Sequence, residues 1–289
     1  MNELYGVALV KNQIIDDNFI NECKEYNSGL VQFMITDYEK NKDIVIKNNL
    51  KVIIHCSYDF NICNPYYKES YNFKKLYNEI KYSYENSNII GYVLHFGYIP
   101  KNKNIEKERI TKEKAIENFN VNIIKCLKLI HQDIKQNNIQ KKEYFSLLLE
   151  PLSGNINEII ENIDDLQKYI KECGTIFNEY MKGIKICLDT AHLYAMGYDL
   201  SDKNLIKVLK EIFNKISINN IGLIHLNDQE KDLGKHGDKH ALLGKGNIGL
   251  KSLFAIYNIC KTFNISFICE TDGSVKNNIG LLQSIENKK

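Results

Sequence analysis

Residues that bind metals are concentrated in one stretch of the chain, "IGLIHLNDQEKDLGKHGDKHALLGKGNIG", which spans residues 221–249. Three of the seven histidines of the protein lie in it, directly behind an apolar run. Acidic side chains are interleaved with them, and the set comprises His225, Asp228, Asp232, His236, Asp238 and His240. Imidazole nitrogens and carboxylate oxygens are the ligands that zinc and manganese take in proteins. The stretch therefore predicts a metal site.

Imidazole or carboxylate side chains also close six consecutive apolar runs along the chain. The runs are short and nearly continuous in apolar character, as parallel strands covered on both faces are. Their terminal residues are His55, His95, Glu150, Asp189, His225 and Glu270. One such residue alone would be read as a helix cap or a structural histidine. Six in one concavity would repel one another strongly unless cations lay among them.

Eight apolar runs of this kind are expected to form β-strands. The expected strands are 6–10, 30–35, 51–56, 89–97, 145–150, 184–190, 221–228 and 265–271. Helical patterns separate them, most clearly at 112–136 and 204–216. This alternation favours one α/β domain over residues 1–289, and eight units favour a closed (β/α)8 TIM barrel. The carboxyl ends of barrel strands meet at one mouth, so the six terminal residues would meet there.

Three more candidate ligands follow two of these strands. His192 lies one helical turn after the sixth strand in "DTAH", and Asp238 and His240 point the same way if "DKH" is extended. The nine candidates, five histidines and four acids, are too many for one ion and suit three ions if one carboxylate bridges two. The other histidines, His131 in a helix and His236 in a loop, are expected at the surface, with a contact that supports a ligand as the alternative for His236.

The composition does not identify a binding partner, but it limits the cellular compartments in which the protein is expected. A net charge of +2 argues neither for nor against a polyanionic partner. Eight scattered cysteines without a C-x-x-C pair predict buried free thiols rather than disulfides. No apolar run reaches the roughly 18 residues of a membrane span, and no secretory signal pattern is evident. We therefore expect a soluble intracellular protein, in the cytoplasm or nucleus, that acts as a monomer without a membrane partner.

With these residues in view, the chain resembles the endonuclease IV family of abasic-site DNA endonucleases, which are xylose isomerase-like TIM barrels. The resemblance runs from about residue 50 onward and is most specific in "ICLDTAHLYAMGYDL" (186–200) and "HLND…DKHALLGKGNIG" (225–249). It implies three zinc ions, with manganese as an alternative at one position. The first would be held by His55, His95 and Glu150, the second by Glu150, Asp189, His225 and Glu270, and the third by His192, Asp238 and His240.

The resemblance also implies an activity. It is the hydrolysis of the DNA phosphodiester 5′ to an abasic site, which leaves a 3′ hydroxyl, and the removal of blocked 3′ ends in base excision repair. The partner would be double-stranded DNA that carries such lesions. Several dications can stabilise both the attacking and the leaving oxygen of this reaction, with Glu150, Asp189 and Glu270 as the catalytic carboxylates. "VLHFG" and "DTAH" are nearer to virus-encoded members, which adds a virion to the expected locations.

The segments that would contact DNA depart from the family pattern. Tyr58 and Lys239 are the candidate DNA contacts, although Lys239 stands where the family has an arginine. Asp59 stands where an apolar wedge is expected, and the loop "MITDYEKN" (34–41) lacks the residues with which members penetrate DNA. The metal ligands are unaffected by these departures.

Two alternative functions remain open. Four of the candidates alone resemble the single-metal site of sugar isomerases and epimerases: Glu150, Asp189, His225 and Glu270. A one-metal isomerase would have no use for the other five, so metal stoichiometry separates it from the nuclease. The second alternative is a protein that binds abasic DNA, keeps its metals for stability and does not cleave. Incision of an abasic duplex separates that protein from the nuclease.

Overall fold

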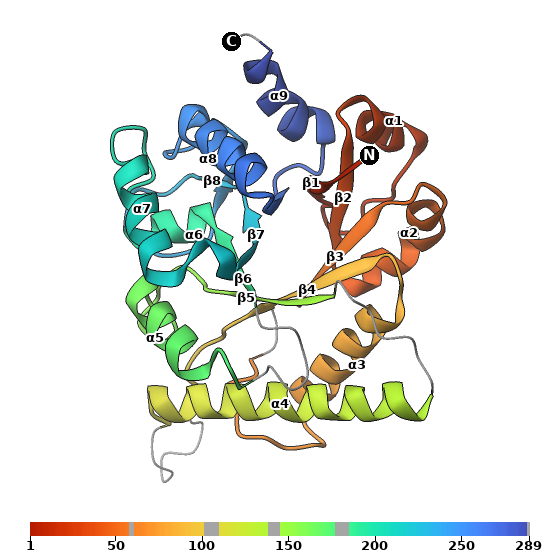
Figure 1. The fold of residues 1–289 in the computed structure, drawn as a ribbon, viewed down its shortest axis with the longest axis vertical. Coiled ribbons are helices and arrows are strands. Elements are labelled where there is room, and N and C mark those ends of the chain that lie inside the picture. The colour runs from red at the N-terminus through yellow and green to blue at the C-terminus, as the bar shows by residue number, and fades with distance from the viewer. Residues whose placement is uncertain (58–60, 101–109, 138–144, 177–184, 288–289) are drawn as a thin grey trace.

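Eight parallel strands close into a barrel in the order β1-β10-β7-β6-β5-β4-β3-β2 (Figure 1). The computed structural model describes residues 1–57, 61–100, 110–137, 145–176 and 185–287. The barrel strands are β1 (Asn2–Ala8), β2 (Ser28–Phe33), β3 (Lys51–His55), β4 (Ile89–His95), β5 (Ser146–Glu150), β6 (Lys185–Asp189), β7 (Ile221–His225) and β10 (Ser266–Cys269). The predicted (β/α)8 TIM barrel is confirmed.

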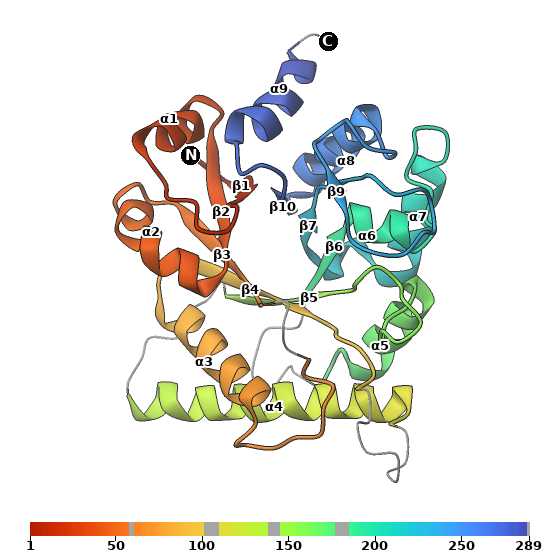
Figure 2. The same cartoon turned by 180° about the vertical axis from the view of Figure 1, so that it is seen from behind.

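Helices surround the strands, and the long helix α4 crosses one side of the molecule (Figures 1 and 2). They are α1 (Asp17–Glu25), α2 (Ile35–Lys47), α3 (Tyr71–Glu85), α4 (Lys112–Gln136), α5 (Ile163–Cys173), α6 (Thr190–Ala195), α7 (Leu205–Ile216), α8 (Leu250–Phe263) and α9 (Leu281–Glu286), with short turns η1 (Ile218–Asn220) and η2 (Lys276–Gly280). Ser70, Thr111 and Asn162 begin α3, α4 and α5 by accepting a hydrogen bond from a backbone N–H of the first turn. Helix α4 has the predicted bounds.

Residues 35–41 of the segment predicted as a loop (34–41) are helical, so that prediction is wrong. Helix α2 begins at Ile35, directly after β2, and side-chain contacts hold it there. Asn41 is buried and donates to the carbonyls of Gln13 and Asp37, while its own oxygen accepts from the backbone of Ile15. The contacts with Gln13 and Ile15 come from the loop between β1 and α1, which a reading of the local sequence does not include.

The seventh barrel strand is shorter than the predicted strand 221–228, because the residues after His225 pair with a distant segment. Strand β7 ends at His225, and the next residues leave the barrel. They form β8 (Asp228–Gln229), which pairs antiparallel with β9 (His240–Ala241) in a separate two-stranded sheet. This pairing returns the chain to the barrel mouth.

Side chains of the strands alternate between two apolar cores. Val52 and Ile54 pack against the helices, whereas Ile53 between them faces the barrel interior. The interior layer consists of Leu30, Ile53, Val93, Leu148, Cys187, Leu223 and Ile268. This layer is an apolar floor, above which the barrel opens.

The cysteines are buried and free at all eight positions, which confirms the prediction of free thiols. Among the described residues, no helix combines the length and the apolar character that crossing a lipid bilayer requires.

Candidate metal centre

Each candidate ligand at a strand end follows a residue of the interior layer by two positions. His55 follows Ile53, and Glu150 follows Leu148. The other pairs are Val93 with His95, Cys187 with Asp189, Leu223 with His225, and Ile268 with Glu270. Since alternate side chains of a strand share a face, these six side chains all project above the apolar floor. The predicted strand 265–271 contains Glu270, but the observed strand β10 ends at Cys269, so Glu270 is the first residue after it.

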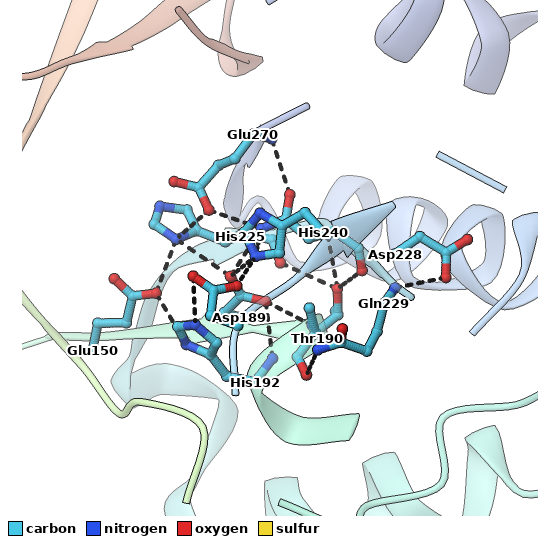
Figure 3. A network of polar contacts seen from close by, with 12 residues as sticks. Glu150, Asp189, Thr190, His192, His225, Asp228, Gln229, His240 and Glu270 are labelled. Atoms are coloured by element: carbon cyan, nitrogen blue, oxygen red, sulfur yellow. Dashed lines mark hydrogen bonds and ion pairs between the residues drawn. The ribbon is translucent and has the colours of Figure 1, made fainter. Parts of the chain in front are cut away.

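Glu150 lies at the centre of the cluster and is only 1% exposed. Its Oε2 lies 3.3 Å from Nε2 of His55 and 3.4 Å from Nε2 of His95. Its Oε1 lies 3.1 Å from Nδ1 of His225 (Figure 3). Oε1 also lies 3.5 Å from Nδ1 of His192. Each oxygen of the carboxylate therefore faces two imidazoles, as a ligand shared by two ions would.

His225 is fully buried and faces three carboxylates. Its Nδ1 lies 3.2 Å from Oε2 of Glu270 and 3.9 Å from Oδ2 of Asp189, in addition to its contact with Glu150. Its Nε2 donates to Oε1 of Gln32 at 2.9 Å, and Gln32 donates to Oε1 of Glu270 at 2.6 Å. A ring held through one nitrogen by a neighbouring acceptor, with the other nitrogen left for a cation, is the usual arrangement of a metal-binding histidine.

A second group of candidate ligands joins the cluster from α6, from β9 and from the loop between β8 and β9. Asp238 Oδ1 lies 2.7 Å from Nε2 of His240, and its Oδ2 lies 3.7 Å from Nε2 of His192. His240 Nε2 is also 3.4 Å from Oδ2 of Asp189, so this group adjoins the first. The Nδ1 of His192 donates to the carbonyl of Pro151 at 3.0 Å, which leaves Nε2 for the acid. All nine candidate ligands thus meet at one mouth.

Two amide side chains belong to the cluster although the strand-end pattern does not predict them. Asn227 donates through Nδ2 to Asp189 and to Glu270, both at 2.8 Å. Gln32 follows the interior residue Leu30 by two positions, the same spacing that places the ligands. A polar residue inside the apolar run "LVQFMI" was the available signal for Gln32. Both amides hold carboxylates of the cluster in place.

The cluster requires positive charge. Burial on its own lowers the pKa of His192, but the nearby carboxylates, Asp189 first among them, outweigh burial and raise this pKa to about 10. Burial is likewise overcome at His225, whose pKa rises to about 9, and at His240, whose pKa rises to about 11. Burial alone would raise the pKa of Glu150, yet the histidines hold it well below its ordinary value. Dications would displace these imidazolium protons, and the donor set suits them.

Asp228 has a structural role in the stretch that first suggested a metal. It is fully buried, and its carboxylate accepts from the backbone N–H groups of Gly246, Ile248 and Gly249 at 2.9 to 3.3 Å. A Cβ on Gly246 would press against this carboxylate, so the turn needs glycine there. Asp228 fixes the end of the loop that carries Asp238.

The remaining candidates lie away from the cluster. His236 is exposed as predicted and donates through Nδ1 to the carbonyl of Ser153 at 3.1 Å, whereas His131 on α4 is partly buried. Lys239 is exposed and pairs with Glu230 at 2.5 Å. Tyr58 and Asp59 lie outside the described residues.

Sequence comparisons relate the chain to named endonucleases. Residues 22–286 match the xylose isomerase-like TIM barrel family. A protein of Acanthamoeba polyphaga mimivirus, described as an endonuclease 4, is 30% identical over 233 residues, which are 78% of this chain and 68% of that one. A protein of Mesomycoplasma hyopneumoniae with the same description is 33% identical over 244 residues, which are 83% of this chain and 75% of that one.

Solved structures share the barrel but not one activity. Endonuclease IV from Thermus thermophilus superposes with a TM-score of 0.69 at 18% identity over 99% of both chains. A 3-keto-D-glucoside 4-epimerase from E. coli superposes with a TM-score of 0.59 at 13% identity, over 99% of this chain and 100% of that one. Such likeness concerns the fold, which hosts both chemistries. The sequence relatives and the set of candidate ligands, rather than the fold, therefore distinguish an endonuclease from an epimerase.

Proposed function

Because the chain belongs to the endonuclease IV family of xylose isomerase-like TIM barrels, we propose that it is a metal-dependent AP endonuclease. It hydrolyses the DNA phosphodiester 5′ to an abasic site, leaves a 3′ hydroxyl and cleans blocked 3′ ends in base excision repair. The observation that supports this most strongly is the convergence of five imidazoles and four carboxylates at one mouth, where four of the imidazoles lie within 3.5 Å of an oxygen of Glu150. We further propose that residues 1–289 act as one endonuclease domain, as a monomer on duplex DNA.

The nine side chains are assigned to three zinc ions, with manganese as an alternative at one position. The two oxygens of Glu150 support its role as the ligand common to the first two ions. Asp189 lies closer to His240 than to His225, so it borders the third position as well as the second. The assignments are His55, His95 and Glu150 for the first ion, Glu150, Asp189, His225 and Glu270 for the second, and His192, Asp238 and His240 for the third.

Zinc bound at these positions would act as a Lewis acid on a phosphodiester and would make water a nucleophile near neutral pH. The protein itself supplies a preorganised mouth. The catalytic carboxylates Glu150, Asp189 and Glu270 are held by imidazoles and by the amides of Gln32 and Asn227. The apolar floor keeps water from reaching them from below. An abasic nucleotide would enter this mouth at a reduced unstacking cost, because its base is already missing.

Replacement of the shared carboxylate tests the proposal. The assay follows incision of a duplex with one abasic analogue by purified, zinc-loaded protein, with and without a chelator. We expect incision that the chelator removes, and we expect Glu150→Gln or Asp189→Asn to abolish it, since either change leaves ligands without their charge partner. Glu117→Gln, an exposed exchange on α4, serves as the matched control and should cleave normally. Wild-type rates in Glu150→Gln would contradict the proposal.

Zinc content separates this function from the single-metal epimerase with the same fold. Elemental analysis of the purified protein should find about three zinc ions per chain. One ion per chain, without incision of the abasic duplex, would favour the epimerase.

A further inference from the structure

The loop between β5 and α5, which leaves the barrel at the cluster residue Glu150, exposes an isoleucine. Ile156 is 82% exposed, the largest fraction among the exposed large hydrophobic side chains of the described residues. The loop begins at the shared ligand Glu150, and its first carbonyl, that of Pro151, accepts from His192. Single exposed apolar side chains are common on protein surfaces, so exposure alone decides nothing.

Hydrogen bonds hold this loop in one conformation. Glu158 is 6% exposed and accepts from the backbone of Gly154 and from Nδ2 of Asn155, both at 2.7 Å. Glu158 also forms an antiparallel bridge with Tyr98 of the neighbouring loop, which is itself 45% exposed. A buried carboxylate thus braces the loop that carries Ile156. An apolar side chain on a braced loop loses little conformational freedom when it binds.

The adjacent segment of the rim is rich in lysine. The loop that joins β7 to α8 exposes four lysines, Lys231, Lys235, Lys239 and Lys245, and three acids, Glu230, Asp232 and the candidate ligand Asp238. Glu230 pairs with Lys239. The hydrogen bond from His236 to Ser153 joins this loop to the one that carries Ile156. Lysines beside a mouth that accepts a phosphodiester can hold the flanking phosphates, which positions a duplex without reading its sequence.

We propose that these two loops form a duplex-binding rim in which Ile156 inserts into the base stack beside the lesion while the lysines hold the backbone. The inference rests on the proposed DNA substrate. Apolar side chains that enter base steps unstack them and bend the duplex, and the cost is lowest where a base is already missing. Segment 34–41 does not supply such a tip, because its exposed side chains, Thr36, Glu39 and Lys40, are polar.

The experiment mixes excess zinc-loaded protein with a duplex that carries one abasic analogue and 2-aminopurine in the neighbouring base pair. Fluorescence reports unstacking of 2-aminopurine, and quenched samples report incision in the same reaction. We expect the wild type to raise the fluorescence before it cuts. In Ile156→Ser the rise should be largely lost, and half-maximal incision should need about tenfold more protein, as when one buried isoleucine no longer contributes.

Two further variants keep the test specific. Ile156→Leu should restore both signals, since it keeps the apolar tip. Ile46→Ser, at an isoleucine that is 52% exposed on α2, should behave as wild type. If wild-type protein incises and Ile156→Ser matches it in fluorescence and half-maximal concentration, the insertion of Ile156 is refuted while the nuclease stands. If the fluorescence rise depends on Ile156 but nothing is cut, the inference holds and the proposed nuclease function fails.

Discussion

Gln32 determines which nitrogen of His225 faces the carboxylates. Its oxygen accepts the Nε2–H of the ring, so Nδ1 is left toward Glu150 and Glu270. His55 is fixed in a similar way, because its Nδ1 donates to the carbonyl of Cys56 at 2.8 Å. At the scale of residues, uncharged hydrogen-bond partners thus orient the ligands before any ion arrives, which lowers the cost of binding one.

Gln32→Leu should weaken zinc binding by about 10- to 100-fold while the barrel still folds. The leucine removes the acceptor of His225 and the donor to Glu270, and leaves a buried N–H unpaired. Competition against a chromophoric chelator measures the affinity.

Two other variants control the Gln32 experiment. Gln136→Leu makes the same exchange at an exposed position of α4 and should bind zinc as the wild type does. Gln32→Glu keeps an acceptor for His225 but sets a second charge against Glu270. Unchanged affinity in Gln32→Leu would show that His225 does not depend on this contact.

At the scale of elements, the sequence predicts the strands and the residues at their ends, but not the conformation of every segment between them. The ligands at strand ends could be predicted from the sequence, because each follows an apolar strand residue by two positions and parallel strands share one mouth. Gln32 has the same spacing but no charge, so a search for charged strand ends passes over it. Segment 34–41 was misjudged because the contacts that hold it as a helix, such as those of Asn41, come from another loop.

Asp228 organises the longest described loop at the mouth, and its removal should destabilise the protein. Asp228→Ala deprives four backbone N–H groups of an acceptor, those of Gln229, Gly246, Ile248 and Gly249, so we expect the free energy of unfolding to fall by about 2–4 kcal/mol. The midpoint of urea denaturation in the presence of a chelator measures the loss without a contribution from metal.

Asp228→Asn keeps one carbonyl oxygen and should lose about half as much stability. Asp232→Ala, at an exposed position of the same loop, should change it by no more than about 0.5 kcal/mol. Equal stability of Asp228→Ala and the wild type would mean that the loop is held by other contacts.

For the whole molecule, the cluster links folding to pH. His192, His225 and His240 have pKa values raised to about 10, 9 and 11, so they stabilise the metal-free fold fully below about pH 6.5 and lose this contribution as pH rises through those values. Glu150 and Asp189 have lowered pKa values, so their contribution is present above about pH 4.5 and is lost in acid. The metal-free protein should be most stable between these limits.

Thermal melting across pH tests this linkage. The Tm of chelator-treated protein should be highest between about pH 4.5 and 6.5 and should fall toward pH 10. Zinc should raise Tm by about 5 °C or more at 100 times its Kd, and by more at pH 8 than at pH 6, because protons and zinc compete for the same nitrogens. Calcium prefers oxygen ligands and should have little effect. A Tm of the metal-free protein that rises from pH 6.5 to pH 10 would contradict the assigned charges.

The apolar floor and the ligands are alternate residues of the same strands, as Leu148 and Glu150 illustrate. A substitution in the floor would therefore move a ligand, whereas a substitution at a rim position without a ligand, such as Ile156, leaves the ligands where they are. Descendants of such a barrel are free to acquire new preferences among damaged substrates while inheriting the hydrolytic apparatus intact. Divergence should accumulate at the rim long before it reaches the strands.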